Sequence, residues 1–477
     1  MSANANLVLS KQELEEKARQ PVEESLRLHD FYKGKIQIAL RCPIHNLDDF
    51  ALWYTPGVAS SCRAIEGDPL RIYDLTNKSN MIAIVSDGSR VLGLGNIGAH
   101  AALPVMEGKA LLFKYLGGVD AVPICLGTQD HKEFVRTVRL LEPTFGGINL
   151  EDIEQPRCFR ILETLRQSMP IPVWHDDQQG TATALLAGLL GALKVVGKDI
   201  RSVRIGMIGM GAANVANYRL LKAYGVDPAQ IVACDTQGTL HRNRRDIESQ
   251  QTEFLEKWAV CQETNRETIA GGIPETLRGA DVCIAFSSPG PGVIEAGAVR
   301  SMARHAIVFA CANPDPEIWP WEAKEVGAQI VATGRSDFPN QVNNSLVFPG
   351  IFRGTLDSRA ATISDEMALA AALELAKCAE EQGLSQERIL PTMADWRVVP
   401  RIAAAAAMKA QETGVSHRTR TRDEYVEFAT RRIIDAQDTV QMLMREGFIA
   451  PMPPTRKNSR AHALGLAAQS RTGPSHR

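Results

Sequence analysis

The chain has 477 residues, of which 44% are hydrophobic and 23% charged, a composition typical of soluble globular proteins. A chain of this length can form about two or three domains with large buried cores. Its formal net charge of -2 indicates neither a nucleic-acid-binding surface nor an acidic disordered chain, so we expect no nucleic-acid partner. A small anionic ligand would therefore have to be held by a local pocket.

The cysteine and apolar residues favour a cytoplasmic location. Nine cysteines are scattered singly without a C-x-x-C pair, which suits reduced thiols. The first residues lack the basic and apolar regions of a signal peptide. The longest apolar run, 181–198, is interrupted by Gly188, Gly191 and Lys194, and we expect it to be too short to cross a membrane. We therefore expect a cytoplasmic protein with no membrane partner.

In chain order, the first part alternates helices and strands. Residues 11–30 have the charged amphipathic pattern of a helix, and residues 33–40 (KGKIQIAL) have the pattern of a short strand. Strands are predicted at 81–85 and 121–125, and between them lie a glycine-rich segment and an apolar helix. This alternation favours an α/β layer.

A second alternation begins near residue 203. Near-continuous apolar strands separated by helices are typical of a doubly wound parallel sheet, the Rossmann-like fold. The predicted strands are 203–209, 231–235, 281–288, 305–314 and 329–334.

The predicted domains follow from these patterns. We expect an N-terminal α/β domain over 1–170, a Rossmann-like domain over 171–360, and a helical segment over 361–450 that packs back on the first domain. Residues 451–477 are basic and contain no acid, and we expect a disordered tail there.

A glycine-rich turn marks the expected dinucleotide site. Gly209-x-Gly211 follows a strand and Ala212 opens a helix, whose backbone amides can hold a pyrophosphate. Asn214 occupies the third fingerprint position, so the turn alone is a weak match. Asp235 ends the next strand, where a carboxylate accepts hydrogen bonds from the adenosine ribose, and this favours NAD over NADP.

Four carboxylates form a second group. Glu151 and Asp152 follow a glycine-rich turn, and Asp176 and Asp177 precede an apolar helix. Carboxylates are ligands that Mg²⁺ or Mn²⁺ prefers, but an Asp before a helix also serves as an N-cap. The pattern leaves metal binding and capping equally open.

Two further residues are candidates for proton transfer. Lys109 lies among apolar residues, and a buried lysine near a cation can be neutral and act as a base. Tyr54 lies in LWYTPGVA. Without further context, a surface lysine and a core tyrosine are the more frequent explanations of such residues.

Seven motifs in order resemble those of malic enzymes, particularly the short prokaryotic type. They cover roughly residues 28 to 420, and their spacing makes the match far more specific than a dinucleotide fingerprint. The motifs are WYTPGVA, DGSRVLGLGNIG, PVMEGKALLFK, FGGINLEDI, PVWHDDQQGTAT, CANPDPEIW and ATGRSDFPNQVNNSLVFPGIFRG.

The resemblance implies catalytic roles. Lys109 would be the general base, Tyr54 the general acid, and Asp176 would orient Lys109. The implied ligands of Mg²⁺ or Mn²⁺ are Glu151, Asp152 and Asp177. Residues 1–170 would then form the malate-binding domain and residues 171–360 the NAD(P)-binding domain, in a homodimer or larger homo-oligomer.

The resemblance also assigns the substrate-binding residues. Arg90 falls where many members place an arginine that binds a substrate carboxylate, although some have a small residue there. Asn313 and Asn344 would contact substrate and the nicotinamide end of the cofactor. Asn214 and Gln179 depart from the usual pattern, since other members often have His at the latter position.

The implied activity is oxidation of L-malate to oxaloacetate, decarboxylation, and protonation at C3 to give pyruvate. Three alternatives remain open: a malolactic enzyme that releases lactate, a ligand sensor that has lost activity, and a nucleic-acid-binding module acting through the basic tail. Measuring net reduced cofactor would separate the malolactic reaction from the malic one, and any turnover would exclude the inactive sensor. A salt-sensitive gel shift that is lost on removal of residues 451–477 would support the nucleic-acid-binding module.

Overall fold

The computed structural model describes residues 24–454, which form two compact units. One unit contains the described residues up to 37 together with the described residues from 438 to 454. Within it, residues 24–32 are helical, and the Tyr32 hydroxyl donates to the Ala450 carbonyl at 2.9 Å. The rest of the helix predicted at 11–30 and most of the predicted tail lie outside the described residues.

The strand predicted at 33–40 is wrong. These residues form a turn followed by irregular chain, and Ile38 is 99% exposed. Among the described residues the segment has no neighbouring strand with which to pair, so its alternating pattern cannot be used in a sheet.

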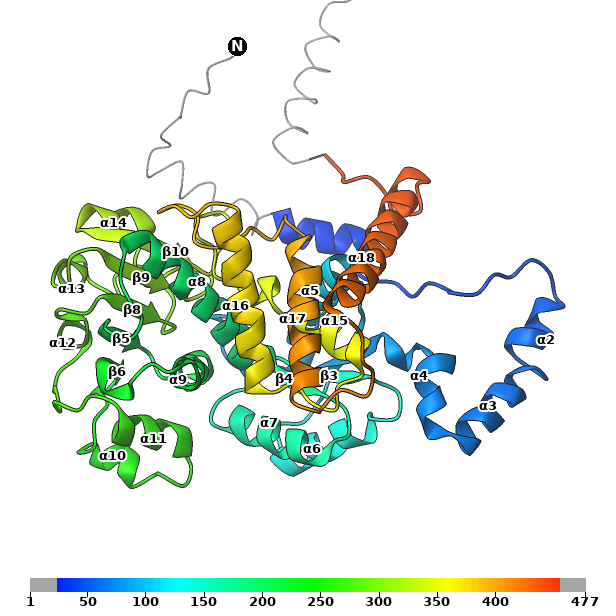
Figure 1. Ribbon diagram of the computed structural model, residues 1–477, viewed down its shortest axis with the longest axis horizontal. Coiled ribbons are helices and arrows are strands. Elements are labelled where there is room, and N and C mark those ends of the chain that lie inside the picture. Colours follow the sequence, from blue (N-terminus) through cyan, green and yellow to red (C-terminus); the bar gives the residue numbers. More distant parts are fainter. Residues whose placement is uncertain (1–23, 455–477) are drawn as a thin grey trace, which may run out of the picture. The chain divides into compact units, whose positions relative to one another are not determined.

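The second unit, residues 38–437, contains two sheets. The first has four parallel strands in the order β2-β1-β3-β4, and the predicted strands at 81–85 and 121–125 lie in it. Helices α6 and α7 lie on one side of this sheet and α15 and α17 on the other (Figure 1). The bounds are β1 Met81–Ser86, α5 Gly98–Gly117, β2 Asp120–Cys125, α6 His131–Leu140, β3 Gly147–Leu150, α7 Arg157–Ser168 and β4 Val173–His175.

The second sheet has the predicted doubly wound form. Its strand order is β10-β9-β8-β5-β6-β7, and all pairs are parallel except the short β6–β7 pair. The strands are β5 Ile205–Ile208, β6 Ile231–Asp235, β7 Gly238–Thr239, β8 Val282–Ala285, β9 Ala306–Ala310 and β10 Ala328–Thr333. The helices between them are α9 Ala212–Tyr224, η4 Pro228–Gln230, α10 Arg245–Glu248, α11 Leu255–Glu263, α12 Ile273–Leu277, α13 Ala296–Arg300 and α14 Pro320–Glu325.

The last described helices are packed closely at glycines. A Cβ at Gly350 would lie 2.7 Å from the Ile402 side chain, and one at Gly354 would lie 2.1 Å from the Ala403 carbonyl oxygen. Helix α15 therefore packs directly on α17, and α15 also contacts α5 while α16 contacts α8. The elements are η5 Asn344–Leu346, α15 Phe348–Ser358, α16 Asp365–Glu381, α17 Val398–Glu412 and α18 Arg422–Arg445.

Helix α8, Thr181–Val196, lies in the core of the second unit. It continues directly from a π-helical turn, η3 Asp176–Gly180, and the combined 21 residues are long and apolar enough to cross a membrane. The expectation that this run is too short was therefore wrong on length. Most of it is buried against other helices, including α9 and α16, as in the core of a folded protein.

The segment before β1 consists of short helices. Residues of α2, α3 and α4 are all described, and none of them is buried. The elements are α2 Asp49–Trp53, α3 Val58–Gly67, η1 Pro69–Arg71, α4 Ile72–Leu75 and η2 Asn77–Ser79.

Candidate active site

A cavity of about 720 Å³ lies where the carboxyl ends of strands from both sheets meet. Because strands in each sheet are parallel, their following loops gather at one edge, which is where ligands bind in open α/β sheets. The wall includes residues of α5, the loop after β3, the η3–α8 turn, the turn before α9, and loops after β8, β9 and β10. Its volume lies within the usual range of ligand pockets.

Lys109 forms the buried centre of this site. Its Nζ lies 2.6 Å from Asp176 Oδ2, 2.9 Å from Glu151 Oε1 and 4.3 Å from the centre of the Phe348 ring. Lys109 is 8% exposed and lines the cavity, so it is not a surface lysine. The predicted contact between Lys109 and Asp176 is therefore present.

The η3 turn positions Asp176. This residue follows β4 and is completely buried, and Trp174 Nε1 donates to its Oδ1 at 3.0 Å. Gly180 closes the turn, since a Cβ there would lie 1.9 Å from Asp176 Oδ1. The N-cap residue of η3 is His175, and Asp176 and Asp177 lie in the first turn of the helix, so neither occupies the N-cap position.

The carboxylates of Glu151, Asp152 and Asp177 lie close to Lys109 and to one another. Asp152 has φ +55°, and its backbone amide donates to Asp177 Oδ2 at 2.8 Å. Asn149 Nδ2 donates to Glu151 Oε2, also at 2.8 Å. The loop after β3 and the turn after β4 are thus tied together, which brings the two predicted acidic pairs to one place.

Burial and mutual charge interactions shift the pKa values of these carboxyl groups and of Lys109. Burial raises the pKa of Glu151 and Asp152 well above their usual values, and repulsion from Asp177 raises both further. Burial alone would lower the pKa of Lys109, but attraction to Asp176 and Glu151 outweighs burial and raises it. One lysine therefore faces more negative charge than it can neutralise.

The carboxylates fit a divalent cation by their donor chemistry. Asp152 Oδ2 is buried and has no hydrogen-bond partner among the described residues, as expected for an oxygen that awaits a ligand. As they stand, however, no three His, Cys, Asp or Glu side chains in residues 24–454 converge closely enough to hold an ion. Binding would require the side chains to draw together.

The predicted substrate-binding residues line the same cavity. Arg90, Asn313 and Asn344 all belong to its wall. The backbone amide of Arg90 donates to the Asp152 carbonyl at 3.1 Å, which ties the Arg90 loop to the carboxylates. The guanidinium group is exposed and free to approach an anion.

The dinucleotide turn has the expected geometry. Gly209 has φ +82°, and a Cβ there would lie 2.7 Å from the Phe286 carbonyl oxygen. Gly211 is the N-cap of α9 and lines the cavity with Ala212. Asn214 is buried, and its Nδ2 donates to the carbonyls of Ile208 and Gly209 at 3.0 and 2.7 Å. Asn214, which replaces the usual residue at the third fingerprint position, thus holds the turn in place by hydrogen bonds to its backbone.

Asp235 forms ion pairs with two basic side chains. Arg244 contacts its oxygens at 3.1 and 3.2 Å, and Lys257 Nζ lies 2.5 Å from Oδ2. Burial would raise the pKa of Asp235, but hydrogen bonds from Arg244 and Lys257 outweigh it and lower the pKa. The contact with Lys257, which is 22 residues away from Asp235 along the chain, was not predicted from the sequence.

Tyr54 is the predicted residue that the fold does not bring to the others. It is 71% exposed, and it is not among the described residues that line the cavity. It follows α2, which lies apart from α5 in Figure 1. Tyr54 is therefore neither a core tyrosine nor a member of the assembled site.

Two further residues that contact the site or hold its loops, besides Lys257, were not predicted from the sequence. Phe348 covers the Lys109 ammonium, and Glu317 is fully buried and accepts hydrogen bonds from the Ser287 and Ala312 amides at 2.8 and 3.0 Å. Glu317 thereby holds the loops after β8 and β9. The available signal was an acid within CANPDPEIW, directly after a predicted strand end.

Family models match most of the chain. The model described as malic enzyme, NAD binding domain, matches residues 178–411, and the malic enzyme N-terminal domain matches 33–133 and 128–166. A bifunctional malic/malolactic enzyme of Bacillus subtilis (strain 168) is 47% identical over 86% of this chain and 98% of its own length. An NAD-dependent malic enzyme of Geobacillus stearothermophilus is 48% identical over 81% of this chain and 78% of its own length.

A solved structure agrees with these sequence matches. The crystal structure of Entamoeba histolytica malic enzyme superposes with a TM-score of 0.91 at 44% identity, and the match covers 98% of this chain and 97% of that one. The cavity with its buried lysine, the carboxylates around it and the doubly wound sheet beside it thus occur in a chain that belongs to the malic enzyme family.

Proposed function

We propose that this protein oxidises L-malate and decarboxylates it to pyruvate and carbon dioxide, with a nicotinamide dinucleotide as hydride acceptor. The observation that carries the proposal is the buried Lys109, paired with Asp176 and Glu151, in the wall of the cavity that also contains the Gly211 turn. A base and a dinucleotide-binding turn in one cavity suit removal of a proton and a hydride from the same alcohol.

Lys109 is the proposed base for the C2 hydroxyl proton. To accept that proton its amine must be neutral, whereas the surrounding carboxylates favour the ammonium form. Glu151, Asp152 and Asp177 are the residues that would hold Mg²⁺ or Mn²⁺. When bound, such a cation supplies positive charge that compensates the carboxylates and withdraws electrons from the C2 oxygen. Asp176, which Trp174 also holds, keeps the amine oriented.

The remaining side chains have positioning roles. Arg90 would bind a malate carboxylate through charge-assisted hydrogen bonds, and Asn313 and Asn344 would contact the substrate and the nicotinamide. After carbon dioxide leaves, the enolate needs a proton at C3, and Tyr54 is the proposed donor. The reaction also requires that water be kept from the enolate, because water would otherwise compete as a proton source.

NAD is the proposed preferred cofactor, with NADP also accepted. Asp235 at the end of β6 can accept hydrogen bonds from the ribose and repels a 2′-phosphate. Arg244 and Lys257 neutralise much of that charge, so the discrimination should be small. Initial rates with malate and Mn²⁺ test the function and the cofactor together. Absence of malate turnover would reject the function, and a higher kcat/KM with NADP would reject the preference.

A malolactic reaction is a second candidate, because the Bacillus subtilis relative is named a bifunctional malic/malolactic enzyme. It needs the same base, carboxylates and dinucleotide, but the pyruvate formed is reduced before release. Measuring lactate and net reduced cofactor would separate the two outcomes. A ligand sensor without activity is a weaker candidate, because Lys109 retains its contacts with Asp176 and Glu151.

A further inference from the structure

We propose that a groove behind the η3 turn is a binding site for a small aliphatic monocarboxylate, separate from the cavity that contains Lys109. The groove, named here the α9 groove, consists of an inner pocket of about 20 Å³ and an outer hollow of about 550 Å³, which share Arg219 and Asp365 in their walls. The outer volume is typical of ligand pockets, and the inner pocket has room for a group of the size of about one or two water molecules.

The η3 turn contributes residues to both the Lys109 cavity and the groove. Asp177 lines the cavity, whereas Gln178 and Gln179 line the inner pocket. The two glutamines are buried, at 1% and 9% exposure. Short π-helical segments of this kind are frequent at functional sites. A single five-residue turn is therefore in contact with two separate hollows.

The two glutamine amides indicate that the inner pocket takes a ligand with acceptor oxygens. Gln179 Oε1 accepts a hydrogen bond from the His175 backbone amide at 3.1 Å, which fixes the orientation of its amide group. The Nε2 atoms of Gln178 and Gln179 are both buried and have no hydrogen-bond partner among the described residues. Because buried donors in proteins are normally paired, two such donors in one pocket call for acceptors opposite them.

Arg219 supplies positive charge where the inner pocket meets the outer hollow. It is exposed on α9 and makes no hydrogen bond or ion pair with residues 24–454. Arg166, the other cation of the inner pocket, is already engaged: its Nη2 donates to the Ile363 carbonyl at 2.7 Å, and its Nη1 lies 3.8 Å from Asp365. A free guanidinium beside two amide donors matches the oxygens of a carboxylate.

The outer hollow suits an aliphatic tail. Helices α9 and α11 line it with apolar side chains, and Leu255 among them is 62% exposed. An alkyl chain that covers these side chains removes apolar surface from water on both molecules. The apolar lining residues are Val215, Ala223, Leu255 and Ala259.

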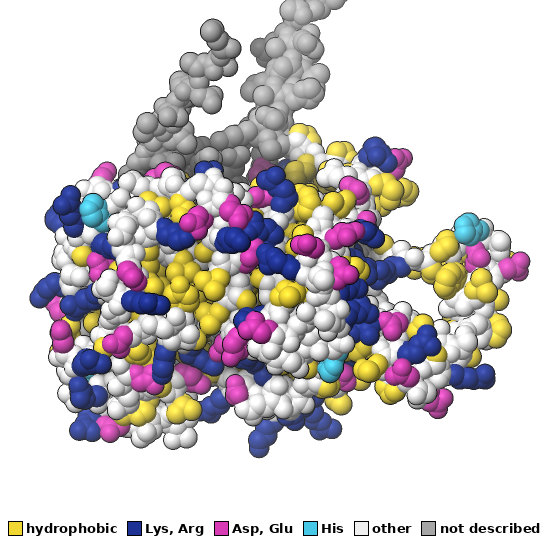
Figure 2. Space-filling view, in the orientation of Figure 1, with side chains coloured by type: hydrophobic (Ala, Val, Ile, Leu, Met, Phe, Trp, Pro, Cys, Tyr) yellow, Lys and Arg dark blue, Asp and Glu magenta, His cyan; other side chains and the backbone are white. Residues whose placement is uncertain are grey.

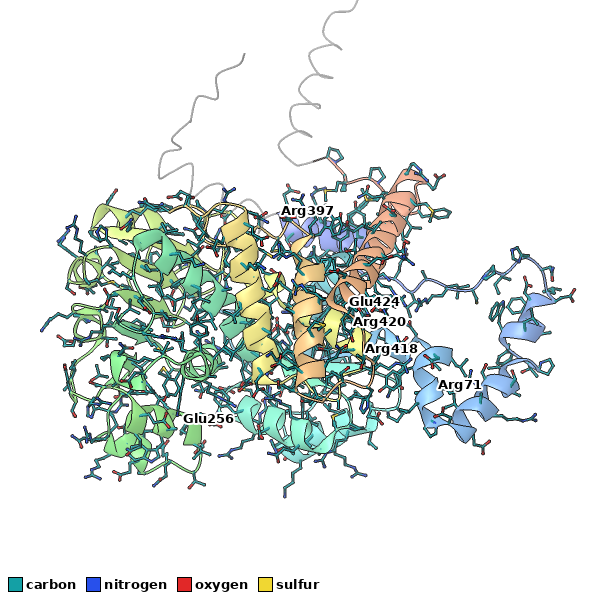
Figure 3. The ribbon with its side chains drawn as sticks, in the orientation of Figure 1. Arg71, Glu256, Arg397, Arg418, Arg420 and Glu424 are labelled. Atoms are coloured by element: carbon teal, nitrogen blue, oxygen red, sulfur yellow. The ribbon has the colours of Figure 1, made fainter. Side chains whose placement is uncertain are left out.

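The charges of the outer hollow disfavour a second carboxylate. Glu263 is paired with Lys222, whereas Glu256 forms no ion pair with the part of the chain that the structure describes. Figure 3 shows Glu256 at the edge of α11 that faces α7. In Figure 2, basic and acidic side chains lie next to one another over the region where α9 and the lower end of α16 lie in Figure 1. A monocarboxylate therefore fits with its charge at Arg219 and its uncharged tail toward α11.

Calorimetric titration of the full chain with hexanoate tests the site. The wild type should bind about one hexanoate per chain, with a dissociation constant of about 1 mM or lower. Hexanol and succinate should bind at least about tenfold more weakly, because hexanol lacks the carboxylate and succinate places a second one near Glu256. Arg219→Gln should weaken hexanoate binding about 10- to 100-fold, the loss expected when a charge-assisted hydrogen bond is removed.

A variant of the turn tests the amide donors. Gln178→Leu keeps a side chain of similar size but removes one donor, so it should also weaken hexanoate binding about tenfold. Since a buried donor without a partner is lost, the variant should unfold at a temperature no lower than the wild type. Wild-type affinity in a folded Gln178→Leu protein would contradict the proposed contact with the turn.

Arg90→Ala is the matched control, because it removes an exposed arginine from the Lys109 cavity instead of the groove. It should bind hexanoate as the wild type does. Binding that is lost in Arg90→Ala but kept in Arg219→Gln would place the carboxylate in the Lys109 cavity and overturn the proposal. So would the absence of wild-type binding at about 10 mM hexanoate, which would mean that water alone fills the inner pocket. None of these measurements uses malate oxidation, so their outcome is separate from that of the proposed function.

Discussion

Replacing Gly180 by alanine should disable the Lys109 site through a single methyl group. The added Cβ would lie 1.9 Å from Asp176 Oδ1, well inside van der Waals contact, and 3.1 Å from Asn344 Cβ. A carboxylate can usually turn aside, but this one is fully buried and held by Trp174 and Lys109 at 3.0 and 2.6 Å. Relief of the clash therefore requires at least one of these contacts to break.

The size of the effect follows from those contacts. Loss of a hydrogen bond to a charged group costs about 1.5–3 kcal/mol, and alanine recovers about 1 kcal/mol through its higher helix propensity. The free energy of unfolding should therefore fall by about 0.5–2 kcal/mol. Activity should fall more, by about 10²-fold in kcat, because displacement of the base-orienting carboxylate by about 1 Å misplaces the Lys109 amine.

Gly188→Ala is the matched control, since Gly188 lies in the following helix and its nearest neighbours are side chains, the closest at 3.2 Å from an added Cβ. Malate oxidation and thermal unfolding would be measured for both variants at saturating Mn²⁺ and cofactor. Gly188→Ala should retain kcat within about threefold and should not reproduce the loss. Wild-type kcat and stability in Gly180→Ala would show that Asp176 does not orient the base.

The other residues of the site give four further predictions. Arg90→Ala should raise the KM for malate about 10- to 100-fold with little change in cofactor KM, since about 1.5–3 kcal/mol of charge-assisted hydrogen bonding is lost; unchanged malate kinetics would mean that Arg90 faces elsewhere. Asp177→Asn should be nearly inactive at limiting Mn²⁺, and normal activity there would reject the ligand set. Lys109→Ala should lose about 10²–10⁴-fold in malate oxidation, and partial rescue by small amines would support its role as the base. Lys257→Gln should lower the kcat/KM for NADP relative to NAD, because it removes one of the cations that neutralise Asp235; an unchanged ratio would exclude Lys257 from cofactor selection.

Local patterns were sufficient to predict most of the fold. The strands of the Rossmann-like sheet are short apolar runs bounded by turn residues, and parallel strands buried on both faces require that pattern. The strand prediction at 33–40 failed because the alternation of polar and apolar residues is a property of a single segment. A strand forms only when a neighbouring strand pairs with it. The apolar run 181–198 was judged too short because it was taken to begin at Thr181, whereas the helix continues directly from the π-helical turn Asp176–Gly180.

The site was predictable where its residues share a loop or turn. Glu151 and Asp152 follow one strand, and Asp176 and Asp177 follow the next strand in the same sheet, so parallel pairing brings them together. Lys257 and Phe348 were missed because their contacts with Asp235 and Lys109 depend on how distant helices pack. No local period encodes such a contact, and the residue types are common on helices.

Tyr54 illustrates a limit of a different kind. A motif can identify a residue type that the chemistry requires, but it cannot state whether the fold of the chain brings that residue to the cavity. The apolar side chains on both sides of Tyr54, such as Trp53 and Val58, need a surface to cover them, and the described part of their own chain leaves them exposed.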